Sequence, residues 1–112
     1  MLKVSHKQLI DNALAEVETL EIEDAENFLE DDDALFVDLR DPRELEREGK
    51  IPNAFHAPRG MLEFWVDPTS PYHKEAFASG KRIIFYCQSG WRSALATKAV
   101  QDMGLERVCH IG

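Results

Sequence analysis

The sequence predicts an α/β fold, in which a mostly parallel sheet of about five strands is flanked by helices. Short runs rich in β-branched and aromatic residues, such as residues 34–40 and 82–86, alternate with helical stretches. Strands that alternate with helices pair in parallel through right-handed crossovers. A length of 112 residues suits one domain, and a hydrophobic fraction of 44% is high enough for a packed core.

The charge distribution bears on the kind of partner. The formal net charge is −8, which argues against nucleic acid or an anionic membrane. Residues 1–50 carry 16 acidic and 6 basic side chains, whereas residues 51–112 carry 5 and 7, so the second half suits a small anionic substrate. No leader-like or membrane-length apolar segment is visible, and two cysteines cannot build a disulfide framework. We therefore expect a reduced, cytoplasmic protein.

The first element is an amphipathic helix at residues 5–17, where Ser5 and Gln8 form a capping-box pattern. We treat residues 1–17 as an N-terminal helix that precedes a domain at residues 18–112. Docking on that domain is favoured over an interface with a partner. The apolar stripe of the helix comprises Leu9, Ile10, Ala13, Leu14 and Val17.

A cluster of opposite charges is expected between the second strand and the helix that follows it. That helix begins at Asp41, with a proline in the first turn and Glu44 three residues later. For Asp38, Arg40 and Glu44, structural ion pairing and capping is favoured over catalysis. The elements expected before residue 81 are strands at residues 19–22, 34–40 and 54–58 and helices at residues 23–29, 41 onward, 61–66 and 72–78.

The candidate chemistry centres on Cys87, which follows the buried strand at residues 82–86 and precedes a helix from about Arg92 to Gly104. Gly90 lets the backbone curl. Amide N–H groups of such a loop and of the first helical turn converge on one electropositive point, where they stabilise a thiolate. Arg92 adds a positive charge. Cys87 is thus predicted to be a nucleophile in an anion-binding loop; the alternative is a buried thiol that packs as a small hydrophobe.

Two other residues could take part. Arg59 follows the strand at residues 54–58, at the expected carboxyl edge of the sheet, and is a candidate second anion contact, although an ordinary surface arginine fits equally well. Cys109 lies in the last strand, at residues 107–111, without a following glycine or arginine, so a packed thiol is favoured over a resolving cysteine. No metal site is predicted, because four histidines lack metal-ligand spacing with either cysteine. These are His6, His56, His73 and His110.

Two motifs carry a family resemblance. Residues 87–93, Cys-Gln-Ser-Gly-Trp-Arg-Ser, resemble the active-site loop of rhodanese-like (sulfurtransferase) domains, often Cys-x-Ser-Gly-x-Arg-Ser. Residues 37–40, Glu44 and residues 49–54 are similar to the family signature Asp-x-Arg…Glu…Gly-His-Ile-Pro-Gly-Ala. The resemblance covers most of the chain from about residue 18 and implies a single-domain protein of this family.

The resemblance implies a sulfurtransferase that moves a sulfane sulfur from a donor such as thiosulfate to a thiol or protein acceptor through a persulfide on Cys87. Arg92 would orient the donor anion, loop amides and a hydroxyl of Ser89 or Ser93 would hold the persulfide, and no cofactor is needed. The implied site comprises Cys87 and Arg92 as catalytic residues, Gln88, Ser89, Gly90, Trp91, Ser93 and Arg59 as substrate-binding residues, and Asp38, Arg40 and Glu44 as structural support.

Departures from the family pattern affect the substrates. Gln88 stands where many relatives carry a second arginine, which weakens the expected affinity for thiosulfate, and the bulky Trp91 stands where relatives often have asparagine. Relatives commonly continue after the position of Gly112 into a final helix, so we expect a truncated chain or a partly uncovered sheet face. The N-terminal helix or a second subunit of a homodimer would then cover that face.

Two alternative functions remain at this point. Phosphatases and arsenate reductases of related fold have five residues between cysteine and arginine, whereas four separate Cys87 from Arg92, so a phosphatase is disfavoured. The other alternative is a non-catalytic or regulatory partner-binding rhodanese-like module. Many such modules lose the cysteine, whereas this chain keeps Cys87, Gly90 and Arg92.

Overall fold

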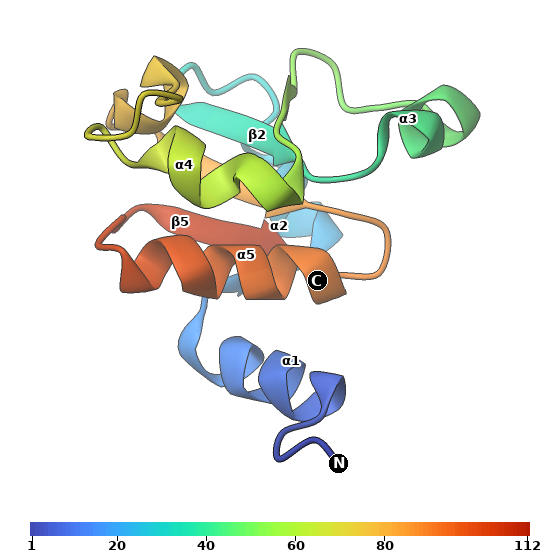
Figure 1. Cartoon of the computed structure of the whole chain (residues 1–112). Helices are drawn as coiled ribbons and strands as arrows, with labels where there is room; N and C mark the ends of the chain where they lie inside the picture. Colours follow the sequence, from blue (N-terminus) through green and yellow to red (C-terminus); the bar gives the residue numbers. More distant parts are fainter.

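The computed structural model describes residues 1–112 and confirms the α/β class. One five-stranded sheet has the order β1-β5-β4-β2-β3, and every pair of neighbours is parallel. Helices α4 and α5 lie on one face of the sheet and α2 on the other (Figure 1). The strands are β1 (Thr19–Leu20), β2 (Ala34–Asp38), β3 (Phe55–His56), β4 (Arg82–Tyr86) and β5 (Val108–Ile111).

The helices agree with most of the predicted positions. The helix expected at residues 72–78 is only a 3₁₀ turn, because residues 70–73 form a separate turn in which the His73 N–H donates to the Ser70 carbonyl at 3.2 Å. None of the helices has the length and apolar character needed to cross a membrane. They are α1 (His6–Glu16), α2 (Ile22–Glu26), α3 (Pro42–Glu48), α4 (Leu62–Val66), α5 (Trp91–Asp102) and the 3₁₀ helices η1 (Arg59–Met61) and η2 (Glu75–Ala78).

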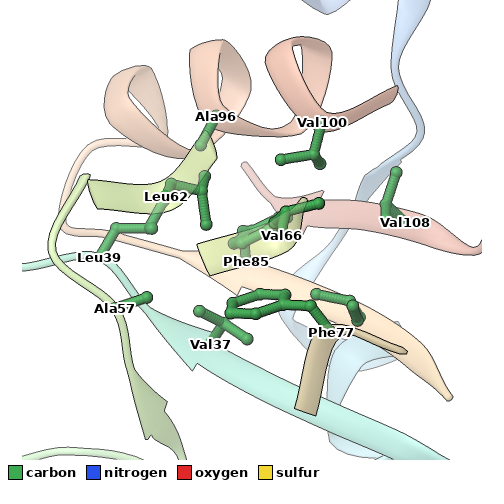
Figure 2. Close-up of a cluster of buried hydrophobic side chains, with 11 residues drawn as sticks. Val37, Leu39, Ala57, Leu62, Val66, Phe77, Phe85, Ala96, Val100 and Val108 are labelled. Carbon is green, nitrogen blue, oxygen red and sulfur yellow. The ribbon is translucent and has the colours of Figure 1, made fainter. Parts of the chain in front are cut away.

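Strand β4 holds the centre of the fold because both of its faces are buried. Ile83 and Phe85 point into a cluster of 11 buried residues that the sheet shares with α4 and α5 (Figure 2). Ile84 and Tyr86 alternate with them and belong to the smaller cluster against α2. This two-sided burial explains the continuous apolar run in the sequence. It also fixes the carboxyl end of β4, where the chain continues into Cys87.

The N-terminal helix packs on α5 rather than on the sheet (Figure 1). Ile10 and Ala13 are buried there, and the Gln101 side chain donates to the Glu16 carbonyl at 3.0 Å. The expected stripe is only partly buried, since Leu9 and Leu14 remain 49% and 43% exposed. The capping box is half formed: Ser5 Oγ accepts the Gln8 N–H at 3.1 Å, while the Gln8 side chain bonds to Asn12.

The expectation that α1 covers an open sheet face is therefore wrong, because its buried side is occupied by α5. The open face lies beside α2, where a hollow of about 200 Å³ has an almost entirely apolar lining. Leu29 is 49% exposed at its edge, since α2 ends at Glu26 and the chain continues as tight turns. The lining residues are Ile22, Ala25, Glu26, Leu29, Phe36, Ile51 and Ile111.

Candidate active site

Cys87 lies directly after β4, in a four-residue loop that ends where α5 begins at Trp91. The loop closes on Gly90, whose φ of 84° is in the left-handed region that favours glycine. A side chain there would also meet the Gly112 backbone, because a Cβ would lie 3.2 Å from its carbonyl carbon. Gly90 is thus required both for the turn and for the close approach of the chain after β5.

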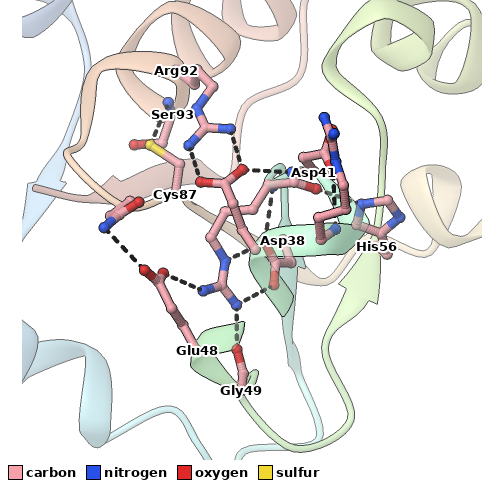
Figure 3. Close-up of polar contacts among 12 residues, drawn as sticks. Asp38, Asp41, Glu48, Gly49, His56, Cys87, Arg92 and Ser93 are labelled. Carbon is pink, nitrogen blue, oxygen red and sulfur yellow. Dashed lines mark hydrogen bonds and ion pairs between the residues drawn. The ribbon is translucent and has the colours of Figure 1, made fainter. Parts of the chain in front are cut away.

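The Cys87 sulfur faces the first turn of α5 (Figure 3). The side chain is partly exposed, and the Ser93 backbone N–H donates to Sγ at 3.4 Å. Such N–H groups have no partner within the helix and lie at the positive end of its dipole. This arrangement can stabilise a negative sulfur, whether a thiolate or a persulfide.

The second cysteine is in a different environment. Cys109 lies in β5, has no exposed surface, and its sulfur is 3.9 Å from the Ile83 carbonyl oxygen. Burial raises the pKa of the Cys109 thiol to about 11, so it stays protonated near neutral pH. Both cysteines are free thiols, and only Cys87 combines access with stabilising donors.

Arg92 is held by Glu44 from α3, 48 residues away in the chain. The guanidinium donates two parallel hydrogen bonds, Nη1 to Oε2 at 2.9 Å and Nη2 to Oε1 at 2.8 Å (Figure 3). Glu44 Oε2 also accepts the Asp41 N–H at 2.8 Å, which completes a capping box at the start of α3. The hydrogen bond from Arg92 is the main reason that the pKa of Glu44 falls to about 2. Arg92 is therefore fixed at the loop rather than free in solvent.

Beneath the loop, Asp38 and Arg40 form a buried ion pair. Arg40 donates from Nε to Asp38 Oδ1 at 3.0 Å and from Nη2 to Oδ2 at 2.8 Å, and Tyr86 Oη donates to Oδ2 at 2.9 Å. Arg40 Nη2 also donates to the Gly49 carbonyl at 2.7 Å. Burial alone would raise the pKa of Asp38, but the hydrogen bonds from Arg40 and Tyr86 outweigh it and hold that pKa below its usual value. The pair thus anchors Tyr86, the residue just before Cys87.

The structure brings some of the predicted substrate-binding side chains to the rim of the loop. Gln88 Nε2 donates to Glu48 at 3.3 Å, and Ser89 is exposed. Trp91 is 54% exposed, and its ring centroid lies 5.6 Å from that of His6 in α1. These contacts show that the N-terminal helix borders the loop, which the sequence spacing did not indicate.

Arg59 and Ser93 have partners of their own in the structure. Arg59 forms an ion pair with Glu63 at 2.9 Å, one turn along the same segment, and has no hydrogen bond to the Cys87 loop. The Ser93 hydroxyl is buried and donates to the Gly90 carbonyl at 3.2 Å. In this structure the Ser93 contact with the sulfur is made by its backbone N–H, and a hydroxyl of Ser89 or Ser93 as donor to a persulfide stays a prediction.

Sequence reasoning missed two partners of these groups. The sequence predicts Tyr86 in a buried strand but gives no sign of its hydrogen bond to Asp38, 48 residues earlier. The sequence predicts His110 in the last strand without a metal-ligand role, and the structure places its ring 2.8 Å from the Ser93 hydroxyl. The position of the His110 imidazole in a buried apolar strand could have indicated such a partner, since buried polar groups need hydrogen bonds.

Comparison with known proteins agrees with this geometry. The model of the family described as "Rhodanese-like domain" matches residues 21–111, most of the chain. The chain belongs to the rhodanese-like family. The family prediction from the two motifs is thereby confirmed.

Two curated relatives show what this rhodanese-like domain is similar to. A sulfurtransferase of Allochromatium vinosum is 28% identical over 87 residues, covering 78% of this chain and 73% of that protein. A tRNA uridine(34) hydroxylase of Escherichia fergusonii is 32% identical over 84 residues, covering 75% of this chain but 23% of that protein. The chain thus spans about a quarter of the length of the curated hydroxylases that it matches.

Solved structures share the fold of this rhodanese-like domain. A Rhodopseudomonas palustris protein, described as of unknown function and a possible tyrosine phosphatase, is 50% identical with a TM-score of 0.95, covering 99% of this chain and 86% of that one. A polysulfide-sulfur transferase homodimer from Wolinella succinogenes is 27% identical with a TM-score of 0.67, covering 94% and 74%. The family match and these two relatives place the chain among proteins that include sulfurtransferases.

Proposed function

We propose that this rhodanese-like domain is a sulfurtransferase that carries a sulfane sulfur as a persulfide on Cys87. The observation that carries the proposal is the position of the sulfur, partly exposed and 3.4 Å from an N–H donor in the first turn of α5. Membership of a family with sulfurtransferase relatives supports the same reaction class. The donor is proposed to be a small anion such as thiosulfate, the acceptor a thiol or a protein-borne nucleophile, and the location cytoplasmic.

In the first half-reaction, the Cys87 thiolate attacks the outer sulfur of thiosulfate. A bond forms between Sγ and that sulfur, the S–S bond of thiosulfate breaks, and sulfite leaves with the bonding electron pair. The enzyme then holds a persulfide anion, which loop amides including the Ser93 N–H would stabilise. In the second half-reaction, the acceptor attacks the outer sulfur, and the Cys87 thiolate is regenerated.

Charged residues around the loop are proposed to support these steps without forming covalent bonds. Arg92 would orient the donor and stabilise the charge on departing sulfite, and the two hydrogen bonds from Arg92 to Glu44 hold its guanidinium for that purpose. The buried pair of Asp38 and Arg40 would support the loop through Tyr86. These groups therefore act by position and charge.

The direct test measures the intact mass of the purified protein, without reductant, after incubation with thiosulfate. We expect a gain of one sulfur atom that cyanide removes as thiocyanate. The same preparation is offered an aryl phosphate, because the R. palustris protein is described as a possible tyrosine phosphatase. Phosphate release without sulfur loading would overturn the proposal in favour of a phosphatase. Neither reaction, with thiosulfate and mercaptopyruvate both tried, would favour the partner-binding module.

A charge introduced at position 88 is expected to lower the KM for thiosulfate. In the single variant Gln88→Arg, Glu48 would hold the new guanidinium, because Glu48 already accepts the Gln88 side chain at 3.3 Å. The informative variant is therefore Gln88→Arg combined with Glu48→Gln, with Glu48→Gln alone as the control. We expect up to about a fivefold lower KM, the equivalent of one exposed ion pair of roughly 1 kcal/mol. An unchanged KM in thiosulfate:cyanide assays would contradict this account of donor binding.

We also propose that Trp91 acts on the acceptor side. Its indole is 54% exposed at the first residue of α5. In Trp91→Asn, the rate with cyanide is expected to change little, whereas the KM for a bulky thiol changes severalfold. Parallel assays with the two acceptors check this, and equal effects on both would contradict it.

We propose that a second copy of the chain covers the apolar hollow beside α2 in a homodimer. Ile22 at its edge is 62% exposed, and the W. succinogenes transferase is described as a homodimer. Light scattering during size-exclusion chromatography should give twice the monomer mass of 12.8 kDa, and Ile22→Glu should restore the monomer. A strictly monomeric species at all concentrations would contradict the dimer.

A further inference from the structure

A buried histidine connects the reactive loop with two strands of the sheet. His110 lies in β5 with no exposed surface, and both ring nitrogens have partners. Nδ1 lies 2.8 Å from the Ser93 hydroxyl of α5, and Nε2 lies 2.9 Å from the Thr19 hydroxyl of β1. Burial holds the pKa of His110 below its usual value, which keeps the ring neutral. A neutral imidazole offers one donor and one acceptor, which matches two hydroxyl partners.

One position of the ring proton satisfies every hydrogen bond around His110. The Ser93 hydroxyl has one proton, for which the Gly90 carbonyl oxygen at 3.2 Å and the Ile111 carbonyl oxygen at 3.5 Å are acceptors. If Nδ1 carries the imidazole proton, His110 donates to Ser93 Oγ, and Thr19 donates to Nε2. This tautomer satisfies all three bonds, whereas the other tautomer would take the Ser93 proton away from Gly90.

Ser93 is the residue through which this chain of bonds reaches the sulfur. Its side chain is held by His110 and Gly90, and its backbone N–H donates to Cys87 Sγ at 3.4 Å. Movement of the Ser93 side chain would displace the same backbone that carries the donor. Thr19, at the outer end of the chain of bonds, precedes residues 21–111, the part that matches the family model.

We propose that His110 is a positioning residue of the Cys87 site, which holds the Ser93 N–H on the sulfur through the Ser93 hydroxyl. The proposal rests on the proposed function in one respect, that Cys87 is the reactive group. It assigns no proton transfer to His110, whose ring does not contact the sulfur. The effect on catalysis comes from the placement of one N–H donor next to a sulfur that carries negative charge in the thiolate and in the persulfide.

Variants at three positions separate the links of this chain. Ser93→Ala removes the hydroxyl. His110→Leu removes both ring contacts and fills the space with an apolar side chain of similar size. His110→Asn restores a donor near the Nδ1 position but cannot reach Thr19, so it is the conservative rescue. Thr19→Val removes only the outer bond and leaves the contact between His110 and Ser93 in place.

The readout is the rate of Cys87 alkylation by iodoacetamide as a function of pH, followed by peptide mass. In Ser93→Ala and His110→Leu, we expect the pH midpoint of that rate to rise by about one unit, because the displaced N–H donor stabilises the thiolate less. His110→Asn and Thr19→Val should stay near the wild-type midpoint. The double variant Ser93→Ala/His110→Leu should shift no further than either single variant, because both act on one chain of bonds.

The outcomes separate this inference from the proposed function and from a merely structural effect. A lower unfolding midpoint with an unchanged pH midpoint, in folded Ser93→Ala or His110→Leu protein, would overturn the positioning role. Failure of His110→Asn to restore the midpoint would do the same. If wild-type protein takes up no sulfur from any donor while the variants still shift the alkylation midpoint, the proposed function fails and the positioning role stands.

Discussion

Replacement of Cys87 by serine is expected to abolish sulfur loading from thiosulfate, whereas Cys109→Ser should load one sulfur as the wild type does. A serine hydroxyl stays protonated at neutral pH and cannot replace a thiolate as the nucleophile toward sulfur, so the rate should fall by at least about 10³-fold. Cys109 cannot take over, because it is fully buried and its pKa is raised to about 11. The intact mass after incubation with thiosulfate, with and without cyanide, measures both variants.

Cys109→Ser is also the control for the integrity of the fold. Its hydroxyl would be buried with the Ile83 carbonyl oxygen about as far away as it is from the present sulfur, 3.9 Å, so some loss of stability is expected without a loss of loading. The urea unfolding curves of both variants are compared with that of the wild type, so that a loss of loading is assigned to chemistry only in folded protein. Sulfur loading of Cys87→Ser would contradict the assignment of the persulfide to Cys87. Loss of loading in folded Cys109→Ser would contradict it as well.

The second large effect is expected on stability. Asp38→Ala should lower the free energy of unfolding by about 3–5 kcal/mol, because it leaves the Arg40 guanidinium buried without its counterion. Asp38 and Arg40 are only 1% and 8% exposed, and the carboxylate also accepts the Tyr86 hydroxyl. Urea denaturation at neutral pH measures the loss. Tyr86→Phe removes one bond of the same cluster and should cost about 1 kcal/mol.

A matched control exists on the surface of α1. Lys7 and Asp11 form an ion pair of the same length, 2.8 Å, but their side chains are 77% and 51% exposed. Asp11→Ala should therefore change stability by less than about 0.5 kcal/mol. A loss of similar size in Asp11→Ala and Asp38→Ala would show that burial of the inner pair does not decide its contribution.

The same carboxylate makes stability depend on pH in a defined direction. The pKa of Asp38 is lower in the folded protein than in the unfolded chain, so its stabilising contribution is fully present above the unfolded value of about 3.9. That contribution is lost as the pH falls through the lower, folded pKa. Urea midpoints measured from pH 7 down to pH 2 should show a smaller acid loss in Asp38→Asn than in the wild type.

The ion pairs Asp38–Arg40 and Glu44–Arg92 support different parts of the Cys87 loop. The Asp38 pair lies in the interior and fixes the strand end that carries Cys87, whereas Glu44 holds Arg92 at the exposed rim. With a pKa of about 2, Glu44 stays charged over the whole range in which a thiolate exists. The orientation of Arg92 is therefore not expected to change with pH between 4 and 9.

Local patterns in the sequence determined the fold class, the position of the reactive loop and the start of α3. The apolar run of β4, the cysteine after it, Gly90 and the start of α5 are neighbours in the chain, and their order alone predicted a loop at the carboxyl end of a strand. The capping box of Asp41 and Glu44 was also predictable, because its hydrogen bonds join residues three apart. The fold class followed from the alternation of such segments.

Only the tertiary structure decided which distant side chains meet. Glu44 holds Arg92, Tyr86 bonds to Asp38, and His110 turns the Ser93 hydroxyl inward, each across a gap in sequence that spacing cannot bridge. The direction of a polar side chain depends on which partners the folded sheet brings within hydrogen-bond distance, about 3 Å. The order of residues in the sequence does not show which distant groups come that close. The loop that contains Ser93 was therefore predictable from the sequence, whereas the direction of the Ser93 hydroxyl was not.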